Sequence, residues 1–472
     1  MKRTITKISL YCSILLMLAG TAQAQNDTAA EFKPHGKLWG YAFGDYAYKG
    51  SNDEPGRGGS NQYTKVPLNS NEFQFRRIYL GYSYEISKKF VAEFLLAAED
   101  DFASGSLGQG NGDILVNNKF SPYVKLANLR WKNLWKGTDL VVGQAPTPTF
   151  AQGAALKEYA RNTQTSEEVW GYRSIERTIT DIRRTPSFDF GATLQGWLDS
   201  KGNYGYDLMV ANGQSAKPEN DPYKWFYGDV YAKFFNKRLI IDFYQDYEKL
   251  NWNPLTTTNN YGVSEVATTT TTTTYNSAGV PTGSTKTTTY ALPSPSALHH
   301  DREMSKIFVA WNDKKFTVGV EYFMATLLGD VQMVGTNKKV YYRTTNASGL
   351  SVFAKGAIYK DKLGFFARFD SYDPTGNLSN IVSTPGIASY SALTSQYDPT
   401  TKEQFVTFGL DYTPIKNVHI MPNVWMNTYT SGVDATGKNS SGTTYASMNG
   451  GISPIKGTDC VYRLTFYYIY GK

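Results

Sequence analysis

The chain has 472 residues, a formal net charge of +7 and 15% aromatic residues, among them 35 Tyr and 25 Phe, while its mean hydropathy is −0.42. This mild charge excludes the strongly basic surface typical of nucleic-acid-binding proteins. A soluble core would use Leu, Ile and Val rather than so many tyrosines. The composition therefore favours a membrane β-barrel, which combines an apolar outer face and aromatic girdles with a polar interior.

The first residues have the pattern of a secretory signal peptide. A basic head over residues 2–7 is followed by an apolar run over 8–20 and by the small residues of Ala22-Gln23-Ala24. The apolar run is shorter than the about 18–20 residues that a membrane-spanning helix needs. Gln25 follows the predicted cleavage site, where a lipoprotein would have Cys. We therefore expect 1–24 to be removed on export.

The remaining chain divides into a short lead, 25–36, and one folded unit, 37–472. Three of the 48 Lys and Arg lie in the signal, which leaves 45 basic against 41 acidic residues and a charge of +4. Cys12 is also removed, so Cys460 stands alone and an internal disulfide is excluded. No segment has the composition of a linker between soluble domains.

Alternation of apolar and polar residues predicts the strands. In 76–86 the residues Ile78 and Leu80 share one face, and 89–100 repeats the pattern after the tight turn Ser87-Lys88. The sixteen strands predicted in this way are 37–48, 76–86, 89–100, 122–131, 138–144, 187–198, 204–213, 224–235, 238–250, 301–311, 315–328, 349–359, 363–372, 403–415, 418–430 and 460–471.

Short turns alternate with long connections between these strands, as in outer-membrane barrels. The even number of strands lets the first and last pair, which removes the sheet edges. A β-sandwich or propeller would show a repeat period or shorter, balanced loops, and the sequence has neither. We therefore predict an all-β fold, a transmembrane antiparallel β-barrel of 16 strands with long extracellular loops. Those loops are 49–71, 101–121, 145–186, 214–223, 251–300, 329–348, 373–402 and 431–459.

The fifth loop, 251–300, is rich in threonine, with an unbroken run at 268–274. Such a segment buries little apolar area, so we expect it to be extended or mobile outside the barrel. A surface loop without chemistry is one interpretation, and a receptor or adhesin site is the other.

Charged side chains are confined to the strand face that would point into the barrel. An Arg or Lys on the lipid face costs about 2–4 kcal/mol at the bilayer centre, so this confinement identifies the inner face. The inner charges predict a water-filled pore, and their mixed sign argues against strong anion selectivity. The predicted lumen wall comprises Arg77, Glu93, Arg130, Lys233, Lys306, Lys355, Arg368, Asp370 and Arg463, together with Glu99, Asp189, Gln195, Asp207, Asp229, Asp242, Glu321, Asp411 and Asn423.

The third loop, 145–186, is the most highly charged connection. Six basic and five acidic residues lie in it, which a loop in bulk water does not need, whereas a loop crossing a channel would present them to permeating ions. A salt-bridged loop packed outside the barrel is the alternative. The predicted pore-constriction residues are Lys157, Arg161, Arg173, Glu176, Arg177, Asp181, Arg183 and Arg184.

Several short motifs in order resemble the phosphate-selective porin O and P family. They are Gly143-Gln144 with Pro146 and Pro148, Ile175-Glu176-Arg177, and the strand start Asp189-Phe190-Gly191 through Gly196; 209–214 and 366–372 are similar to further family elements. The resemblance implies a sixteen-stranded outer-membrane porin, embedded in outer-membrane lipid as a homotrimer. It also implies that the third loop forms a constriction in the lumen, with Glu176 and Arg177 on it. The expected partners are small solutes and ions, including phosphate or other anions, and no nucleic acid.

A surface-recognition or adhesin barrel is the main alternative function, and an outer-membrane enzyme is a less favoured one, because the sequence lacks its signature. Hydrolysis needs a nucleophile with a base in reach, and His35, His299, His300 and His419 lie beside no convincing Ser or Asp motif. The adjacent His299-His300 with Asp301 is a weak metal motif. We therefore predict no catalytic residues, no metal and no cofactor, and weak or modest ion selectivity.

Overall fold

The computed structural model describes most of the chain from residue 32 onward. The described residues are 32–53, 63, 66–99, 115–116, 119–120, 122–150, 163–175, 186–215, 217–219, 222–251, 266–291, 299–335, 340–376, 387–392, 401–431 and 456–471.

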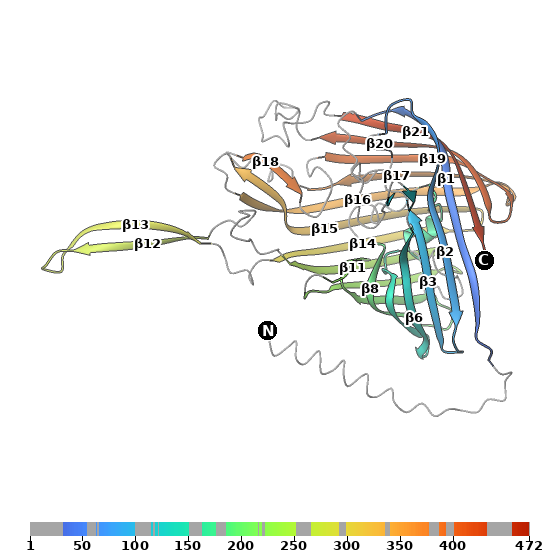
Figure 1. Ribbon diagram of the computed structural model, residues 1–472, viewed down its shortest axis with the longest axis horizontal. Coiled ribbons are helices and arrows are strands. Elements are labelled where there is room, and N and C mark those ends of the chain that lie inside the picture. The colour runs from blue at the N-terminus through green and yellow to red at the C-terminus, as the bar shows by residue number, and fades with distance from the viewer. Residues whose placement is uncertain are drawn as a thin grey trace.

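Sixteen strands form a closed antiparallel barrel, as predicted (Figure 1). They are β1 (His35–Ser51), β2 (Asn71–Glu85), β3 (Phe90–Glu99), β6 (Tyr123–Trp135), β7 (Thr138–Pro146), β8 (Phe188–Trp197), β9 (Tyr204–Ala211), β10 (Trp225–Phe234), β11 (Leu239–Asn251), β14 (His299–Asn312), β15 (Phe316–Gly335), β16 (Val340–Tyr359), β17 (Leu363–Asp373), β19 (Thr401–Ile415), β20 (Val418–Ser431) and β21 (Lys456–Tyr470).

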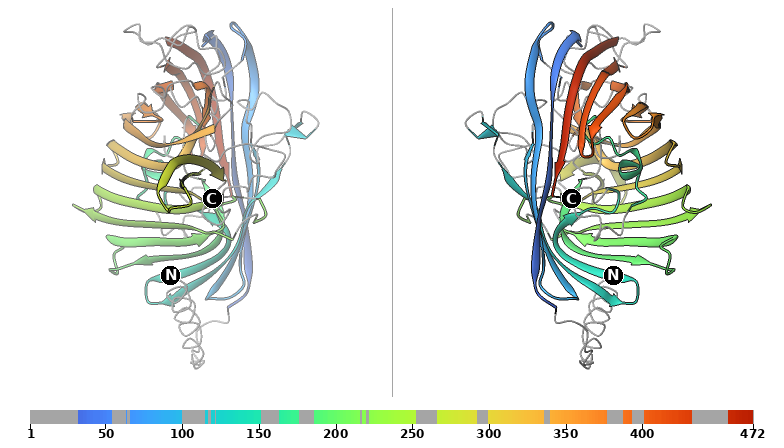
Figure 2. Two further views of the ribbon diagram at one scale, coloured as in Figure 1. Left: turned by 90° about the vertical axis from the view of Figure 1, so that its left-hand side faces the viewer. Right: turned by 90° about the vertical axis from the view of Figure 1, so that its right-hand side faces the viewer.

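The barrel closes where β1 pairs with β21. The register runs from Gly40 opposite Tyr470 to Ser51 opposite Cys460, and Figure 2 shows the first and last strands side by side. Each wall strand thus has a neighbour on both sides, which satisfies its backbone hydrogen bonds without an open edge.

Turns of two to six residues join the strands at one end of the barrel, here called the short-turn end. The other connections lie at the opposite, long-loop end and are longer, except for the four residues between β15 and β16. The predicted long loop 329–348 is wrong. Instead, β15 and β16 continue as a paired hairpin, with Val331 opposite Arg343 and Val334 opposite Val340. A further strand, β18 (Ile387–Ala392), pairs with the same upper part of β15.

The Thr-rich loop contains a hairpin rather than a purely extended chain. Strands β12 (Val266–Tyr275) and β13 (Pro281–Ala291) pair with each other in a separate two-stranded sheet. This hairpin extends away from the barrel in Figure 1. A second small sheet pairs β4 (Leu115–Val116) with β5 (Lys119–Phe120).

Side chains alternate between an outer, apolar face and an inner, buried face. Ile78, Leu80 and Tyr82 are about two-fifths exposed, whereas Arg77 and Tyr79 on the other face of the same strand are buried. The interior is not only polar, because aromatic rings also point inward and fill space there. The inward aromatic residues include Trp39, Tyr41, Phe43, Tyr79, Trp225, Tyr227, Tyr244, Phe323, Phe353 and Phe366.

Helix is scarce in the described part of the chain. Its helix α2 (Ser166–Trp170) has five residues, and no helix among the described residues is long and apolar enough to cross a membrane.

Candidate functional site

The predicted lumen-wall residues all lie on the inner face of the barrel. Their side chains are buried, except that of Lys355, which is half-buried. The wall charges are therefore covered by other groups instead of standing open to water, which departs from the simple picture of a wide aqueous pore.

Part of the third loop lies inside the barrel against this wall. Its described residues are 147–150 and 163–175, and α2 occupies the middle of the second stretch. The Thr165 side chain accepts a hydrogen bond from the Glu168 backbone N–H, 3.3 Å, and so caps the helix N-terminus. Glu167 and Glu168 lie in the first turn, where the helix dipole favours negative charge. Gly171 ends the helix at φ 72°, a left-handed conformation that suits glycine.

Apolar side chains seat this segment on the inner wall. The Trp170 ring lies 5.3 Å from the Phe353 ring and 6.1 Å from the Phe366 ring, between centroids. Val169 and Ile175 join the same buried cluster. The burial of a tryptophan and two aliphatic side chains stabilises the segment in the lumen by several kcal/mol, at about 1.5–3 kcal/mol for each large side chain.

Three basic wall residues donate hydrogen bonds to backbone carbonyl oxygens of the loop. The Lys355 Nζ donates to the Trp170 carbonyl at 2.9 Å, at the C-terminal end of α2, where a cation also complements the helix dipole. Arg76 donates to the Ser174 carbonyl at 2.8 Å and Arg463 to the Ile175 carbonyl at 3.2 Å. These cations therefore hold the loop in place.

A second group of wall residues fixes the preceding part of the loop. The Gln164 side-chain amide donates to Asp229 at 2.9 Å, the Ser166 hydroxyl to Glu321, and Lys306 to the Thr149 hydroxyl at 2.6 Å. The same Lys306 ammonium lies 3.6 Å from Glu321. Loop and wall are thus joined by both neutral and charge-assisted bonds.

The wall charges are unevenly distributed around the barrel. On four consecutive strands, β7 to β10, Asp139, Gln195, Asp207 and Asp229 lie directly opposite one another in the register. Arg130 compensates part of this negative charge through Asp139, at 3.2 Å. Carboxylates thus dominate the wall at β7–β11, whereas the cations that hold the loop carbonyls lie on β2, β16 and β21.

Of the eight predicted constriction residues, Arg173 lies within the described part of the chain. The other seven, Lys157, Arg161, Glu176, Arg177, Asp181, Arg183 and Arg184, lie outside the described residues, and their role stays a prediction.

Arg173 is held by a carboxylate and an aromatic ring. Its guanidinium lies 3.1 Å from Glu167 and 5.9 Å from the centre of the Tyr79 ring. Burial lowers the pKa of Arg173, but the Glu167 carboxylate and the nearby Tyr41 and Tyr79 outweigh burial, so this pKa lies well above its ordinary value. Arg173 therefore stays charged at any physiological pH.

Sequence reasoning missed Arg76, because strict alternation puts it on the lipid face beside Arg77. The structure has a register shift on β1 between Phe43 and Gly44, opposite these two arginines, and both are buried. A bulge is the way to keep two consecutive arginines away from lipid, and the adjacent Arg-Arg pair inside a strand was the available signal.

The contacts of His419 with Asp411 and Tyr467, near the short-turn end, were also not predicted from the sequence. The His419 Nδ1 lies 2.9 Å from an Asp411 oxygen, and its ring stacks on Tyr467 at 5.4 Å. Among the described residues no group of three or more His, Cys, Asp and Glu has the arrangement of a metal site.

No family model and no curated protein matches the chain. Solved structures do match over nearly its whole length. They include the outer membrane channel DcaP of Acinetobacter baumannii, with 9% identity, TM-score 0.51 and coverage of 95% of this chain and 100% of that one. An anion-selective porin from Comamonas acidovorans matches with 10% identity, TM-score 0.49 and coverage of 93% and 100%. OmpT of Vibrio cholerae matches with 10% identity, TM-score 0.48 and coverage of 94% and 100%. At these identities the likeness to DcaP establishes the fold alone, a closed antiparallel β-barrel.

Proposed function

We propose that the chain is an outer-membrane porin, which passes small hydrophilic solutes and ions by passive diffusion with modest selectivity. The observation that carries this proposal is the segregation of side chains on a closed barrel. Leu80 and Phe94 are exposed on the outer face, while Glu93 and Arg130 are buried on the inner face. A barrel with an apolar skin and a charged interior is suited to a bilayer and to the transfer of polar solutes.

The described charges argue against a strong phosphate filter. Arg76, Lys355 and Arg463 already donate to loop carbonyls, and Arg173 already binds Glu167. A cation that is paired in this way attracts a passing anion less than a free one does. The resemblance to the phosphate-selective porin O and P family therefore extends in this proposal to architecture and homotrimeric assembly, with weak selectivity.

The buried wall further supports a narrow passage. Because loop residues and inward aromatic rings cover much of the inner face, we expect a small unit conductance, limited to ions and small solutes.

Conductance in planar bilayers tests the proposal. Discrete steps from the refolded protein, absent with protein kept denatured, are expected. A barrel that inserts but stays silent would overturn the porin function. The same instrument gives selectivity from the reversal potential under a KCl gradient. Arg173→Gln and Arg177→Ala should move it toward cation preference, whereas Arg238→Gln should not, because Arg238 is half-exposed in a short turn beside Asp313.

The β12–β13 hairpin supports a second candidate function, recognition of an external surface. Nearly all of its described side chains at 270–285 are exposed. The hairpin extends away from the barrel (Figure 1). Binding of cells or matrix by the intact protein, lost on removal of 266–291 while conductance is kept, would favour this function.

A further inference from the structure

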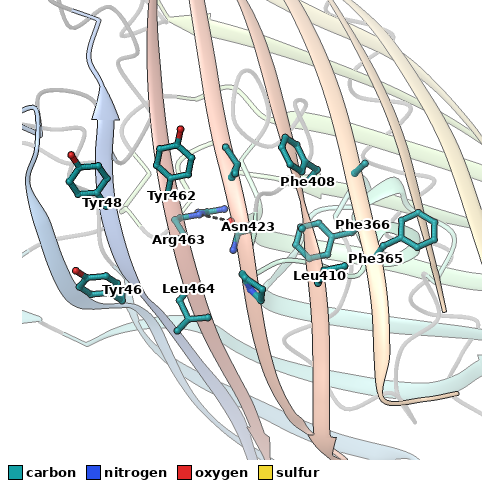
Figure 3. A pocket seen from close by; sticks show the side chains of 14 residues that line it. Tyr46, Tyr48, Phe365, Phe366, Phe408, Leu410, Asn423, Tyr462, Arg463 and Leu464 are labelled. Atoms are coloured by element: carbon teal, nitrogen blue, oxygen red, sulfur yellow. Dashed lines mark hydrogen bonds between the residues drawn. The ribbon is translucent and has the colours of Figure 1, made fainter. Parts of the chain in front are cut away.

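The outer face of the barrel carries a groove of about 730 Å³ across β1, β21, β20, β19 and β17. Figure 3 shows its side chains, with Tyr48 and Tyr462 at one end and Leu410 and Phe365 toward the other. The surface is almost wholly apolar, although the inward-facing residues Phe366, Asn423 and Arg463 lie behind its floor. Its lining residues are Tyr46, Tyr48, Phe365, Phe366, Ala367, Phe408, Gly409, Leu410, Pro422, Asn423, Val424, Tyr462, Arg463 and Leu464.

The floor of the groove is low because the outward side chains of Ala367 and Pro422 are short, and the strand pairing beneath it is interrupted. Between β19 and β20 the register runs from Gly409 opposite Asn423 to Tyr412 opposite Ile420, and the two positions between them on each strand are unpaired. Pro422 lies in this gap and has no N–H to donate. A Cβ at Gly409 would come within 2.5 Å of the Pro422 carbonyl oxygen, so glycine is required for the close approach of the strands there.

Large side chains form ridges on either side of this floor. Tyr46, Tyr462 and Leu464 on β1 and β21 are 38–52% exposed, and Phe408 on β19 is 48% exposed. Ala367 on β17 is an exposed residue with a short side chain, which leaves the space beside Phe408 open.

Polarity changes along the groove. In Figure 3 the hydroxyls of Tyr48 and Tyr462 both point along the strands toward the long-loop end, and the Tyr48 hydroxyl donates to the Asn69 side chain at 2.9 Å. Leu410, Leu464 and Phe365 line the part farther from that end, together with Tyr46, which adds a hydroxyl at one side of the groove (Figure 3). An apolar channel that ends in tyrosine hydroxyls matches a molecule with a hydrocarbon tail and a polar head at the membrane interface.

We propose that this groove binds an acyl chain of an outer-leaflet lipid, with hydroxyl groups of the lipid head donating to the Tyr48 and Tyr462 oxygens. The proposal requires the barrel to lie in a membrane and is independent of what the barrel conducts. A second copy of the chain fits less well, because its own outer face is a convex wall of large residues that would rest on the ridges. A single flexible chain can reach the floor at Gly409 and Ala367.

Native mass spectrometry of the detergent-extracted full-length protein, titrated with palmitoyl-oleoyl phosphatidylglycerol, tests this site. Ala367→Trp fills the groove without removing any hydrogen bond. Its matched control is Ala192→Trp, at an exposed alanine on the outer face of β8, away from the groove. We expect Ala367→Trp to weaken the tightest lipid-binding step at least tenfold, and Ala192→Trp to leave it unchanged.

Two results would overturn the proposal. One is equal retention of lipid by Ala367→Trp and wild type, and the other is a change of oligomer mass in Ala367→Trp with lipid binding unaltered, which would make the groove a contact between subunits. Unchanged channel conductance in both variants shows that the barrel is folded. If Ala367→Trp does not fold, Ala367→Leu partly fills the same space and should weaken binding in the same direction.

Discussion

Several basic side chains of the wall are held in position by hydrogen bonds to the third loop. A buried cation needs compensation, and Lys355, Arg76 and Arg463 obtain part of it from carbonyl oxygens of 170–175. Reciprocally, the carbonyls at the end of a short helix need donors. The inward basic residues are thus explained by loop attachment before any effect on permeating ions is considered.

Loss of Lys355 should loosen the loop. Lys355→Met keeps most of the side-chain volume but leaves the Trp170 carbonyl without its donor, at a cost of about 1.5–3 kcal/mol for a hydrogen bond to a charged group. We expect larger current fluctuations in single-channel records and faster proteolysis within 163–175. Lys360→Met is the control, since Lys360 is exposed in the turn after β16. Equal behaviour of the two variants would show that Lys355 does not hold the loop.

Arg173 and Glu167 should behave as one unit. Removing either partner takes this ion pair away from the other buried charge, which costs up to about 3–5 kcal/mol, whereas removing both costs less. Arg173→Gln and Glu167→Gln should each lower the unfolding temperature more than the double variant does, measured by heat-dependent mobility in gels. Additive losses would mean that the two groups are not coupled.

The inward position of the wall charges could be predicted from the sequence, whereas the contacts between the wall and the third loop could not. Alternation identifies inward positions such as Arg130 and Asp229, because lipid excludes charge from the other face. The partners of those residues come from a loop with no periodicity, so contacts such as that between Arg463 and Ile175 could not be foreseen.

At the level of elements, the strands were predicted best where they cross the bilayer. There the lipid demands an apolar face over about 9–11 residues. β15 and β16 have 20 residues each, and their paired upper part has no lipid to face, so the alternation fades and 329–348 was predicted as a loop. The β12–β13 hairpin was not predicted for the same reason, since β-branched threonine favours strands but a run of threonines does not alternate in polarity.

Removal of the β12–β13 hairpin should leave the barrel intact. The hairpin pairs with itself in a separate sheet, so deletion of 266–291 removes no wall hydrogen bond. We expect an unchanged unfolding temperature and unchanged unit conductance. A lower unfolding temperature would reveal a structural role for the hairpin.

The interrupted pairing between β19 and β20 should be restored when Pro422 is replaced by a residue with a backbone N–H. The Pro422 carbonyl lies next to Gly409 on β19, and in a regular strand the N–H of a residue points to the same side as its carbonyl. Pro422→Val therefore adds a donor toward β19 and should stabilise the barrel by about 1 kcal/mol. Hydrogen exchange should show stronger protection at 410–411. Pro374→Val, beyond the end of β17, is the control and should leave this region unchanged.

At the scale of the whole molecule, closure depends on the two ends of the chain. The first and last wall strands, separated by the rest of the sequence, pair over most of their length. Non-local pairing of this kind makes barrel formation slow and cooperative. The pairing of the first and last strands could be predicted, because an even number of strands leaves both ends of the chain at the short-turn end.

A disulfide across the seam tests this closure directly. Tyr46 lies opposite Leu464 in the register, and opposed side chains have Cβ atoms about 4.5–5.5 Å apart, near the range that a disulfide spans with small adjustment. In a Cys460→Ser background, Tyr46→Cys with Leu464→Cys should form a bond on mild oxidation, identified by joined tryptic peptides, and should raise the unfolding temperature. Tyr46→Cys with Tyr468→Cys should not, because the second position is four residues farther along β21, about 13 Å away. Efficient bonding of the offset pair in place of the opposed one would mean that the seam has a different register or is open.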